Sequence, residues 1–158
     1  MARAGRRTPL PSTSFGDDWL RIGPPVIGID GRVQGQTAAL FEPHSNNPSG
    51  TFRGSFRVSQ EMADEFCLLA HKAGFQIAAI PHGDHAITVT LEAIEKAMRA
   101  YPRPDPPHRL EHAYLWNAAT FEKAAELNII YNWQPPAVHR FCRARAQRAS
   151  SAAASVCA

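Results

Sequence analysis

The chain has 158 residues, of which 44% are hydrophobic and 20% are charged, so it is long enough for one domain with a sizeable core. No run approaches the roughly 20 apolar residues of a membrane-spanning helix, and no apolar segment follows the basic start of the chain, so we expect neither a membrane protein nor a secretory signal. The formal net charge of +3 comes from arginines near the two ends, and the acidic middle of the chain argues against a nucleic-acid-binding surface.

The first predicted strand lies within residues 24–31, where a short apolar run ends in Asp30-Gly31. Residues 32–58 are rich in Gly, Pro, Ser and Asn, and long excursions of this kind are usually functional or disordered. A helix follows, with Ser59 as its N-cap and Gly74 at its end. Its predicted apolar face consists of Met62, Phe66, Leu69 and Ala73. Residues 75–80 are the second predicted strand.

The second predicted helix begins at Asp84 as its N-cap and is stopped by the proline-rich residues 102–107. Its apolar face consists of Ile87, Leu91, Ile94 and Met98. Residues 110–115 are the third predicted strand. Asn117 caps a third helix, Asn128 ends it, and residues 129–133 are the fourth strand. This alternation predicts an α/β fold of about four βα units with a parallel sheet.

The two ends of the chain differ in composition from its middle. Residues 1–15 and 139–158 are rich in arginine and small or polar residues, so we expect disordered tails around one folded unit at 16–138. The three cysteines form no CxxC pair, which predicts a reduced, cytoplasmic setting without a disulfide framework. Cys67 lies in an apolar helical stretch and is expected to be a core residue.

Side chains that can bind metals or transfer protons occur near the ends of three predicted strands. They are Asp30 after the first strand, His82, Asp84 and His85 after the second, and His108, Glu111 and His112 around the third. Parallel α/β folds build their sites at the carboxyl ends of the strands. Imidazole and carboxylate groups suit Zn²⁺ or another divalent first-row metal, which lowers the pKa of a bound water and polarises a carbonyl.

Alternatives to a metal site stay open from the residues alone. The His82-Gly83-Asp84 turn also fits a capped helix start, and Glu111 and His112 alternate along a strand, so only one of them can face the site. His71, inside the first helix, is expected to be a solvated surface residue. The remaining histidines, His44 and His139, have no partner nearby in the sequence.

Several short motifs together resemble amidohydrolase family 3, a branch of the metal-dependent amidohydrolase superfamily. They include Ile29-Asp30-Gly31, Gly83-Asp84-His85 and His108-Arg109-Leu110-Glu111-His112-Ala113. Others lie at residues 16–23, 37–40, 42–43, 70–76 and 134–135, and their order covers about three quarters of the chain. The resemblance implies an incomplete (β/α)₈ barrel that spans barrel strands four to seven, and metal-dependent hydrolysis of amide or cyclic amide C–N bonds.

The resemblance also assigns roles to residues. His112 matches the family's metal-binding histidine, His82 is the second candidate ligand, and Asp30 and Asp84 are the candidate catalytic residues. Two positions depart from the family pattern, because Val26 and Ile80 stand where a lysine and a histidine are expected. The implied cofactor is a divalent metal, Zn²⁺ by preference, and the implied partner is a small amide-like substrate.

The reduced ligand set favours a catalytically silent fragment over a complete enzyme. The alternative from another class is a half-barrel interaction module that dimerises or pairs with a complementary barrel half, because an open sheet exposes two edges. Neither alternative implies a nucleic acid or a membrane as a partner.

Overall fold

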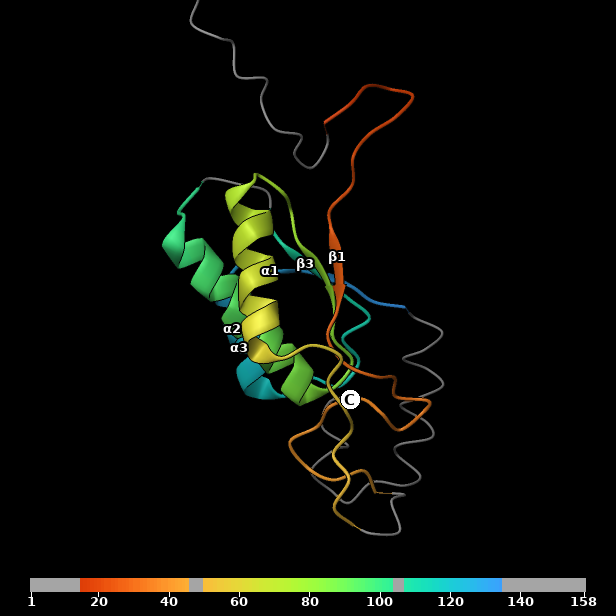
Figure 1. The fold of residues 1–158 in the computed structure, drawn as a ribbon. Helices are drawn as coiled ribbons and strands as arrows, with labels where there is room; N and C mark the ends of the chain where they lie inside the picture. The colour runs from red at the N-terminus through yellow and green to blue at the C-terminus, as the bar shows by residue number, and fades with distance from the viewer. Residues whose placement is uncertain (1–14, 46–49, 104–106, 135–158) are drawn as a thin grey trace, which may run out of the picture.

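The computed structural model describes residues 15–45, 50–103 and 107–134, and strands alternate with helices along this part of the chain (Figure 1). The elements are β1 (Val26–Gly28), α1 (Gln60–Lys72), β2 (Ala78–Ile80), α2 (Asp84–Ala100), β3 (Arg109–Glu111), α3 (Ala118–Glu126) and β4 (Ile130–Asn132). Of the tails expected at residues 1–15 and 139–158, only Phe15 lies within the described residues.

The four strands form one parallel sheet in the order β1-β2-β3-β4. Ala79 is paired with Ile27 on one side and with Leu110 on the other, and Leu110 is in turn paired with Tyr131. Parallel neighbours need a crossover connection, and here each crossover contains one helix. The three helices lie on one side of the sheet (Figure 1). The prediction of four βα units with a parallel sheet is confirmed.

The core lies between the helices and the sheet. Its largest fully buried apolar side chains are Ile29, Ile77, Ile87, Leu91, Ile94 and Leu110. Cys67 is buried among them, and desolvation, with the charge of Asp64 as a smaller cause, raises the pKa of its thiol to about 12. The expectation of a core role for Cys67 is confirmed. Among the described residues, no helix is long and apolar enough to cross a membrane.

Helix α1 has the predicted caps but a different buried face. The Ser59 hydroxyl accepts a hydrogen bond from the Met62 amide at 3.3 Å, and Gly74 follows the helix with a φ of +89°. Met62 and Leu69 are more than half exposed, so the predicted face is wrong at both positions. The helix packs instead through its small residues, because Ala63, Cys67 and Ala70 let α1 approach α2 closely; these three residues are buried.

Helix α2 buries Ile87, Leu91 and Ile94, as predicted. Its N-cap is Gly83, so the expectation that Asp84 caps the helix is wrong by one residue. Asp84 is the first helical residue, and its Oδ1 accepts hydrogen bonds from the amides of His85 at 2.9 Å and Phe41 at 3.1 Å. The carboxylate therefore stabilises the positive end of the helix and connects it to the loop before α1.

Strand β3 is shorter than predicted, whereas α3 ends as predicted. The strand stops at Glu111 because His112 and Ala113 have φ values of +72° and +37°, which a continuing strand cannot have. The Ala113 amide donates to the Pro81 carbonyl at 2.9 Å, which ties this turn to the end of β2. Asn117 caps α3 through the Thr120 amide, and Asn128, with a φ of +52°, follows the helix.

The loop between β1 and α1 packs closely against the start of α2. Asp30 forms an isolated antiparallel bridge with Phe56, and the Ala86 amide points at the Ala39 carbonyl at 3.4 Å. A Cβ atom on Gly83 would lie 1.9 Å from the same Ala39 carbonyl oxygen. Glycine is therefore required at residue 83 for this close backbone approach.

Candidate functional site

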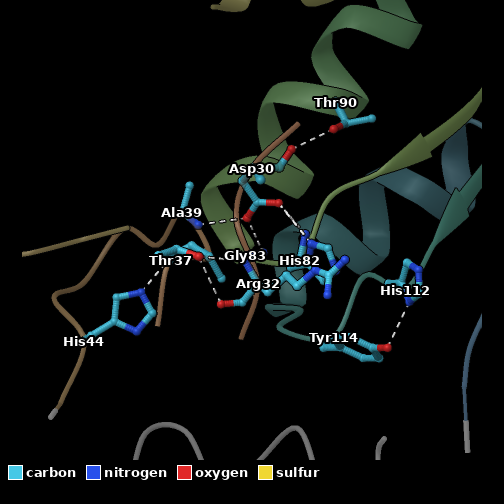
Figure 2. A network of polar contacts seen from close by, with 12 residues as sticks. Asp30, Arg32, Thr37, Ala39, His44, His82, Gly83, Thr90, His112 and Tyr114 are labelled. Atoms are coloured by element: carbon cyan, nitrogen blue, oxygen red, sulfur yellow. Dashed lines mark hydrogen bonds and ion pairs between the residues drawn. The ribbon is translucent and has the colours of Figure 1, made fainter. Parts of the chain in front are cut away.

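The predicted site residues gather at the carboxyl end of the sheet. Asp30 follows β1, His82 follows β2 and His112 follows β3. Figure 2 shows a network of polar contacts around Asp30 and His82, with His112 near His82 and in contact with Tyr114. Because the strands are parallel, their carboxyl ends meet at one edge of the sheet, where α/β folds build their sites. The structure thus brings together three of the four predicted site residues.

Asp30 is the centre of this network and is only 2% exposed. Its Oδ2 accepts hydrogen bonds from the amides of Ala39 at 2.8 Å and Gly83 at 2.9 Å, and its Oδ1 accepts one from the His82 amide at 2.9 Å. The His82 ring places its Nδ1 3.3 Å from the same Oδ1. Asp30 therefore joins the loop after β1 to the end of β2, and its carboxylate faces the Nδ1 side of the His82 ring.

His82 and His112 lie face to face. Their ring centroids are 5.2 Å apart, with an angle of 20° between the ring planes. Burial lowers the pKa of His112 below its usual value, and the neighbouring His82 is the second cause. Both effects disfavour the charged imidazolium and so favour the neutral imidazole, which is the form that binds metals.

Two residues that the sequence did not single out hold His112. Its Nδ1 lies 2.9 Å from the Tyr114 Oη, and this hydroxyl donates to the Gln134 Oε1 at 2.9 Å. Tyr114 was expected inside the third strand, and Gln134 counted only as part of a family motif. The positive φ values of His112 and Ala113 turn the chain so that Tyr114 comes back beside His112.

Asp84 and His85 do not join this network. Asp84 is bonded to the amides of Phe41 and His85 at the start of α2. The His85 ring stacks on Phe41 with centroids 4.4 Å apart and meets Phe56 edge-on at 4.9 Å. Both residues fix the loop before α1 to α2, which also places the loop near the site.

Glu111 is engaged by its neighbours in the sheet. Its Oε1 lies 2.7 Å from the Arg109 Nε, and its Oε2 accepts a hydrogen bond from Asn132 at 2.5 Å. Its charge acts against burial and His82, the two larger causes that lower the pKa of His112. His112, after the strand, is therefore the residue of this pair that belongs to the candidate site.

The described residues include side chains of the type that binds metal ions, but too few of them lie together to form a usual site. Imidazole nitrogens suit zinc and related ions, but a catalytic zinc site usually has three protein ligands. Within residues 15–45, 50–103 and 107–134, no group of three or more His, Cys, Asp or Glu side chains is arranged to hold a metal. Val26, where the family resemblance expects a lysine, is 57% exposed.

A second pair of histidines lies at the other end of the sheet and is structural. The His71 Nδ1 is 3.0 Å from the His108 Nε2, and the Ile77 amide donates to the His108 Nδ1 at 3.0 Å. The His71 Nε2 lies 2.8 Å from the Tyr101 carbonyl. His71 is 3% exposed, so the expectation that it is a solvated surface residue is wrong. Its position four residues after Cys67, on the buried face of α1, was the available signal.

His44 also has a structural partner that the sequence did not reveal. Its Nε2 lies 2.8 Å from the Ala38 carbonyl, and its ring stacks on Phe52. His139 lies outside the described residues.

Two curated proteins have related sequences. The putative amidohydrolase YtcJ of Bacillus subtilis (strain 168) is 32% identical over 117 residues, which are 74% of this chain and 21% of that protein. Protein LONG AFTER FAR-RED 3 of Arabidopsis thaliana is 27% identical over 118 residues, which are 75% of this chain and 20% of that protein. The chain therefore spans about a fifth of the length of these curated relatives.

Solved structures with the same fold come from two archaea. An uncharacterized metal-dependent hydrolase from Pyrococcus furiosus superposes with a TM-score of 0.70 at 28% identity, over 82% of this chain and 26% of that chain. A second, from Pyrococcus horikoshii OT3, gives a TM-score of 0.69 at 25% identity, over 80% of this chain and 24% of that chain. These matches confirm the expected fold, a partial (β/α)₈ barrel.

The sequence model of the amidohydrolase family matches residues 1–156, which is nearly the whole chain. The chain belongs to the amidohydrolase family.

Proposed function

We propose that this chain supplies the middle strands of a metal-dependent hydrolase that acts on amide or cyclic amide C–N bonds. The observation that carries the proposal is the pair of facing imidazoles, His82 and His112, at the carboxyl end of the sheet. Family membership supports the reaction class, and imidazole ligands support Zn²⁺ as the metal. The cytoplasmic setting expected from the cysteines is part of the same proposal.

In this proposal, His112 and His82 would hold the metal, and the other residues support them. When bound, a divalent ion would polarise the substrate carbonyl and make water a stronger nucleophile. Asp30 orients the His82 ring through Nδ1. Asp84 is bonded to backbone amides at the start of α2, and its role as a catalytic residue stays a prediction. The buried position of Asp30 supports a role through His82 rather than direct contact with substrate, and its assignment as a catalytic residue stays a prediction.

The proposal includes a dependence on further barrel strands. Two imidazoles fall one short of the three protein ligands of a usual catalytic zinc site. Complementary strands, in the same polypeptide or in another, would have to provide the rest. The described residues are therefore proposed to be catalytically silent when no such strands are present.

The test is metal analysis of the purified chain after dialysis against trace zinc. We expect less than one retained zinc per chain and no hydrolysis of amide substrates. His112→Ala should abolish the weak zinc binding that a titration detects. His85→Gln should retain it because the His85 ring packs on Phe41 and Phe56. Tightly held stoichiometric zinc would contradict the silent state, and weak binding unaffected by His112→Ala would contradict the ligand assignment.

A second candidate function is that of a half-barrel interaction module. The observation that favours it is that β1 and β4 are the edges of the described sheet, and that each exposes an apolar residue, Val26 at 57% and Ile130 at 44%. Unpaired parallel edges are templates for another chain. Analytical ultracentrifugation distinguishes the candidates: stable dimers that never bind zinc would favour the interaction module.

A further inference from the structure

Tyr114 connects His112 to the end of β4. Its hydroxyl lies between the His112 Nδ1 and the Gln134 Oε1, at 2.9 Å from each (Figure 2 shows the His112 contact). A phenol is protonated at neutral pH. The hydroxyl thus has one hydrogen to donate and lone pairs to accept another hydrogen bond.

The direction of these hydrogen bonds decides the tautomer of His112. The Gln134 Oε1 can only accept, so the Tyr114 hydroxyl donates to it and must accept from His112. The His112 proton is then on Nδ1, and its Nε2 has a bare lone pair. The same logic holds for His82, because a carboxylate oxygen of Asp30 faces its Nδ1 and can only accept.

We infer that Tyr114, oriented by Gln134, is a positioning residue that fixes His112 as the Nδ1–H tautomer, as Asp30 does for His82. Both rings then present bare Nε2 atoms at the carboxyl end of the sheet. Histidine ligands of metals have this arrangement, in which a second hydrogen-bond partner holds the nitrogen that does not bind the metal. The metal-binding consequence rests on the proposed function, but the tautomer assignment does not.

Two variants reverse or preserve the direction of the hydrogen bonds. Gln134→Leu removes the acceptor of the Tyr114 hydrogen, so the hydroxyl can donate to the His112 Nδ1 and should shift the ring to the Nε2–H tautomer. Gln134→Glu keeps an acceptor oxygen and should preserve the Nδ1–H form. Tyr114→Phe removes the hydroxyl altogether and should leave His112 as a mixture of tautomers.

The matched control is Tyr131→Phe. Tyr131 lies on the neighbouring strand β4, and its buried hydroxyl has no hydrogen-bond partner among the described residues. Like Tyr114→Phe, this change removes one phenol oxygen. It should leave the tautomer of His112 unchanged.

The experiment is ¹⁵N-edited NMR of the histidine rings in the full chain without metal, at a pH where the rings are neutral. We expect the Nδ1–H pattern for His112 in the parent chain, in Gln134→Glu and in Tyr131→Phe, and a changed pattern in Tyr114→Phe and Gln134→Leu. A parent His112 with its proton on Nε2, or a pattern that Tyr114→Phe leaves unchanged, would overturn the inference.

A zinc titration of the same variants separates this inference from the proposed function. Loss of a partner that orients a ligand typically weakens metal affinity by about 10- to 100-fold, so Tyr114→Phe should bind zinc about tenfold more weakly and Tyr131→Phe should bind it normally. If the NMR pattern is as expected but the parent chain binds no zinc, the positioning role stands and the proposed metal function fails.

Discussion

The same residue type has opposite roles at the two ends of this sheet. His82 and His112 lie at the carboxyl end, where each ring has one nitrogen engaged by a neighbouring oxygen. His71 and His108 lie at the other end and use both ring nitrogens of each residue in hydrogen bonds that connect α1, β2 and β3. Residue type alone therefore does not identify the site. The two pairs are distinguished by whether the second ring nitrogen also takes part in a hydrogen bond within the described part of the chain.

His108 makes the stability of the fold depend on pH. Burial, with smaller effects of the charges on His71 and Arg103, lowers its pKa from 6.5 to about 4. The unfolded chain binds a proton at His108 below about pH 6.5, whereas the folded chain does so only near pH 4. The stabilising contribution of neutral His108 is thus complete above pH 6.5 and is lost as the pH falls to 4, with a cost of roughly 3 kcal/mol.

Urea unfolding at pH 7 and pH 4.5 measures this effect. His108→Asn keeps a polar acceptor near the Ile77 amide but does not titrate, so it should be less stable at pH 7 and should show a smaller loss on acidification. An equal loss of stability in the variant and the parent chain would show that His108 is not the group responsible.

Tyr131 and Tyr114 should respond in opposite ways to loss of the hydroxyl. The Tyr131 hydroxyl is buried without a partner in the described structure, and an unsatisfied buried group costs about 1–3 kcal/mol. Tyr131→Phe should therefore be neutral or stabilise by up to about 1 kcal/mol, and Tyr114→Phe should destabilise by about 1 kcal/mol, since it breaks two hydrogen bonds. Thermal unfolding of the two variants measures this difference. A lower melting temperature for Tyr131→Phe than for Tyr114→Phe would contradict the prediction.

At the scale of elements, the sequence predicted what depends on local interactions. Ser59 and Asn117 were expected to cap helices and do so, because an N-cap needs only a side-chain oxygen and nearby amides. The end of β3 was mispredicted because the turn at His112 is set by a hydrogen bond from Ala113 to Pro81, far away in the sequence. The buried state of His71 likewise depends on His108, 37 residues later.

The candidate site could be predicted only in part, because some of its contacts join residues that are far apart in the sequence. Asp30, His82 and His112 could be placed together because parallel strands align their carboxyl ends. The separation of Asp84 from them, and the participation of Tyr114 and Gln134, follow from side-chain directions at a cap and a tight turn, which spacing does not reveal.

Gly83 should tolerate no side chain, because the loop after β1 touches the start of α2 there. The Cβ of Gly83→Ala would lie 1.9 Å from the Ala39 carbonyl oxygen, so the loop or the helix must move. Overpacking of this kind costs about 1–3 kcal/mol. Gly23→Ala is the matched control, because its Cβ would have no atom within 4 Å. Equal urea midpoints for the two variants would mean that the loop yields without cost.

At the scale of the whole molecule, the chain is a sheet with two edges and one covered face. The three helices cover one side, and β1 and β4 have no further strand beside them among the described residues. The structural relatives are about three times as long, since 80–82% of this chain covers 24–26% of them. The proposed site therefore depends on strands that would complete the barrel.

Restoring the two family positions should raise metal affinity in a completed barrel. Val26→Lys together with Ile80→His would add two groups of the kind that bind metals, one on β1 and one on β2, to the imidazole of His112. In the chain alone, Val26→Lys should cost little because Val26 is 57% exposed. Ile80→His should cost more, because Ile80 is partly buried. Unchanged zinc affinity in the repaired, assembled protein would refute the alignment at these strands.

The role of His112 is best decided in an assembled barrel. The chain would be co-expressed with the remaining strands of a related hydrolase, and the metal content of the purified complex would be measured together with amide hydrolysis. We expect the complex to hold zinc that the separate parts do not hold, and His112→Ala to remove both the zinc and the activity while His85→Gln keeps them. A complex that assembles and retains its full zinc content in His112→Ala would contradict the proposal that this chain supplies part of the metal site.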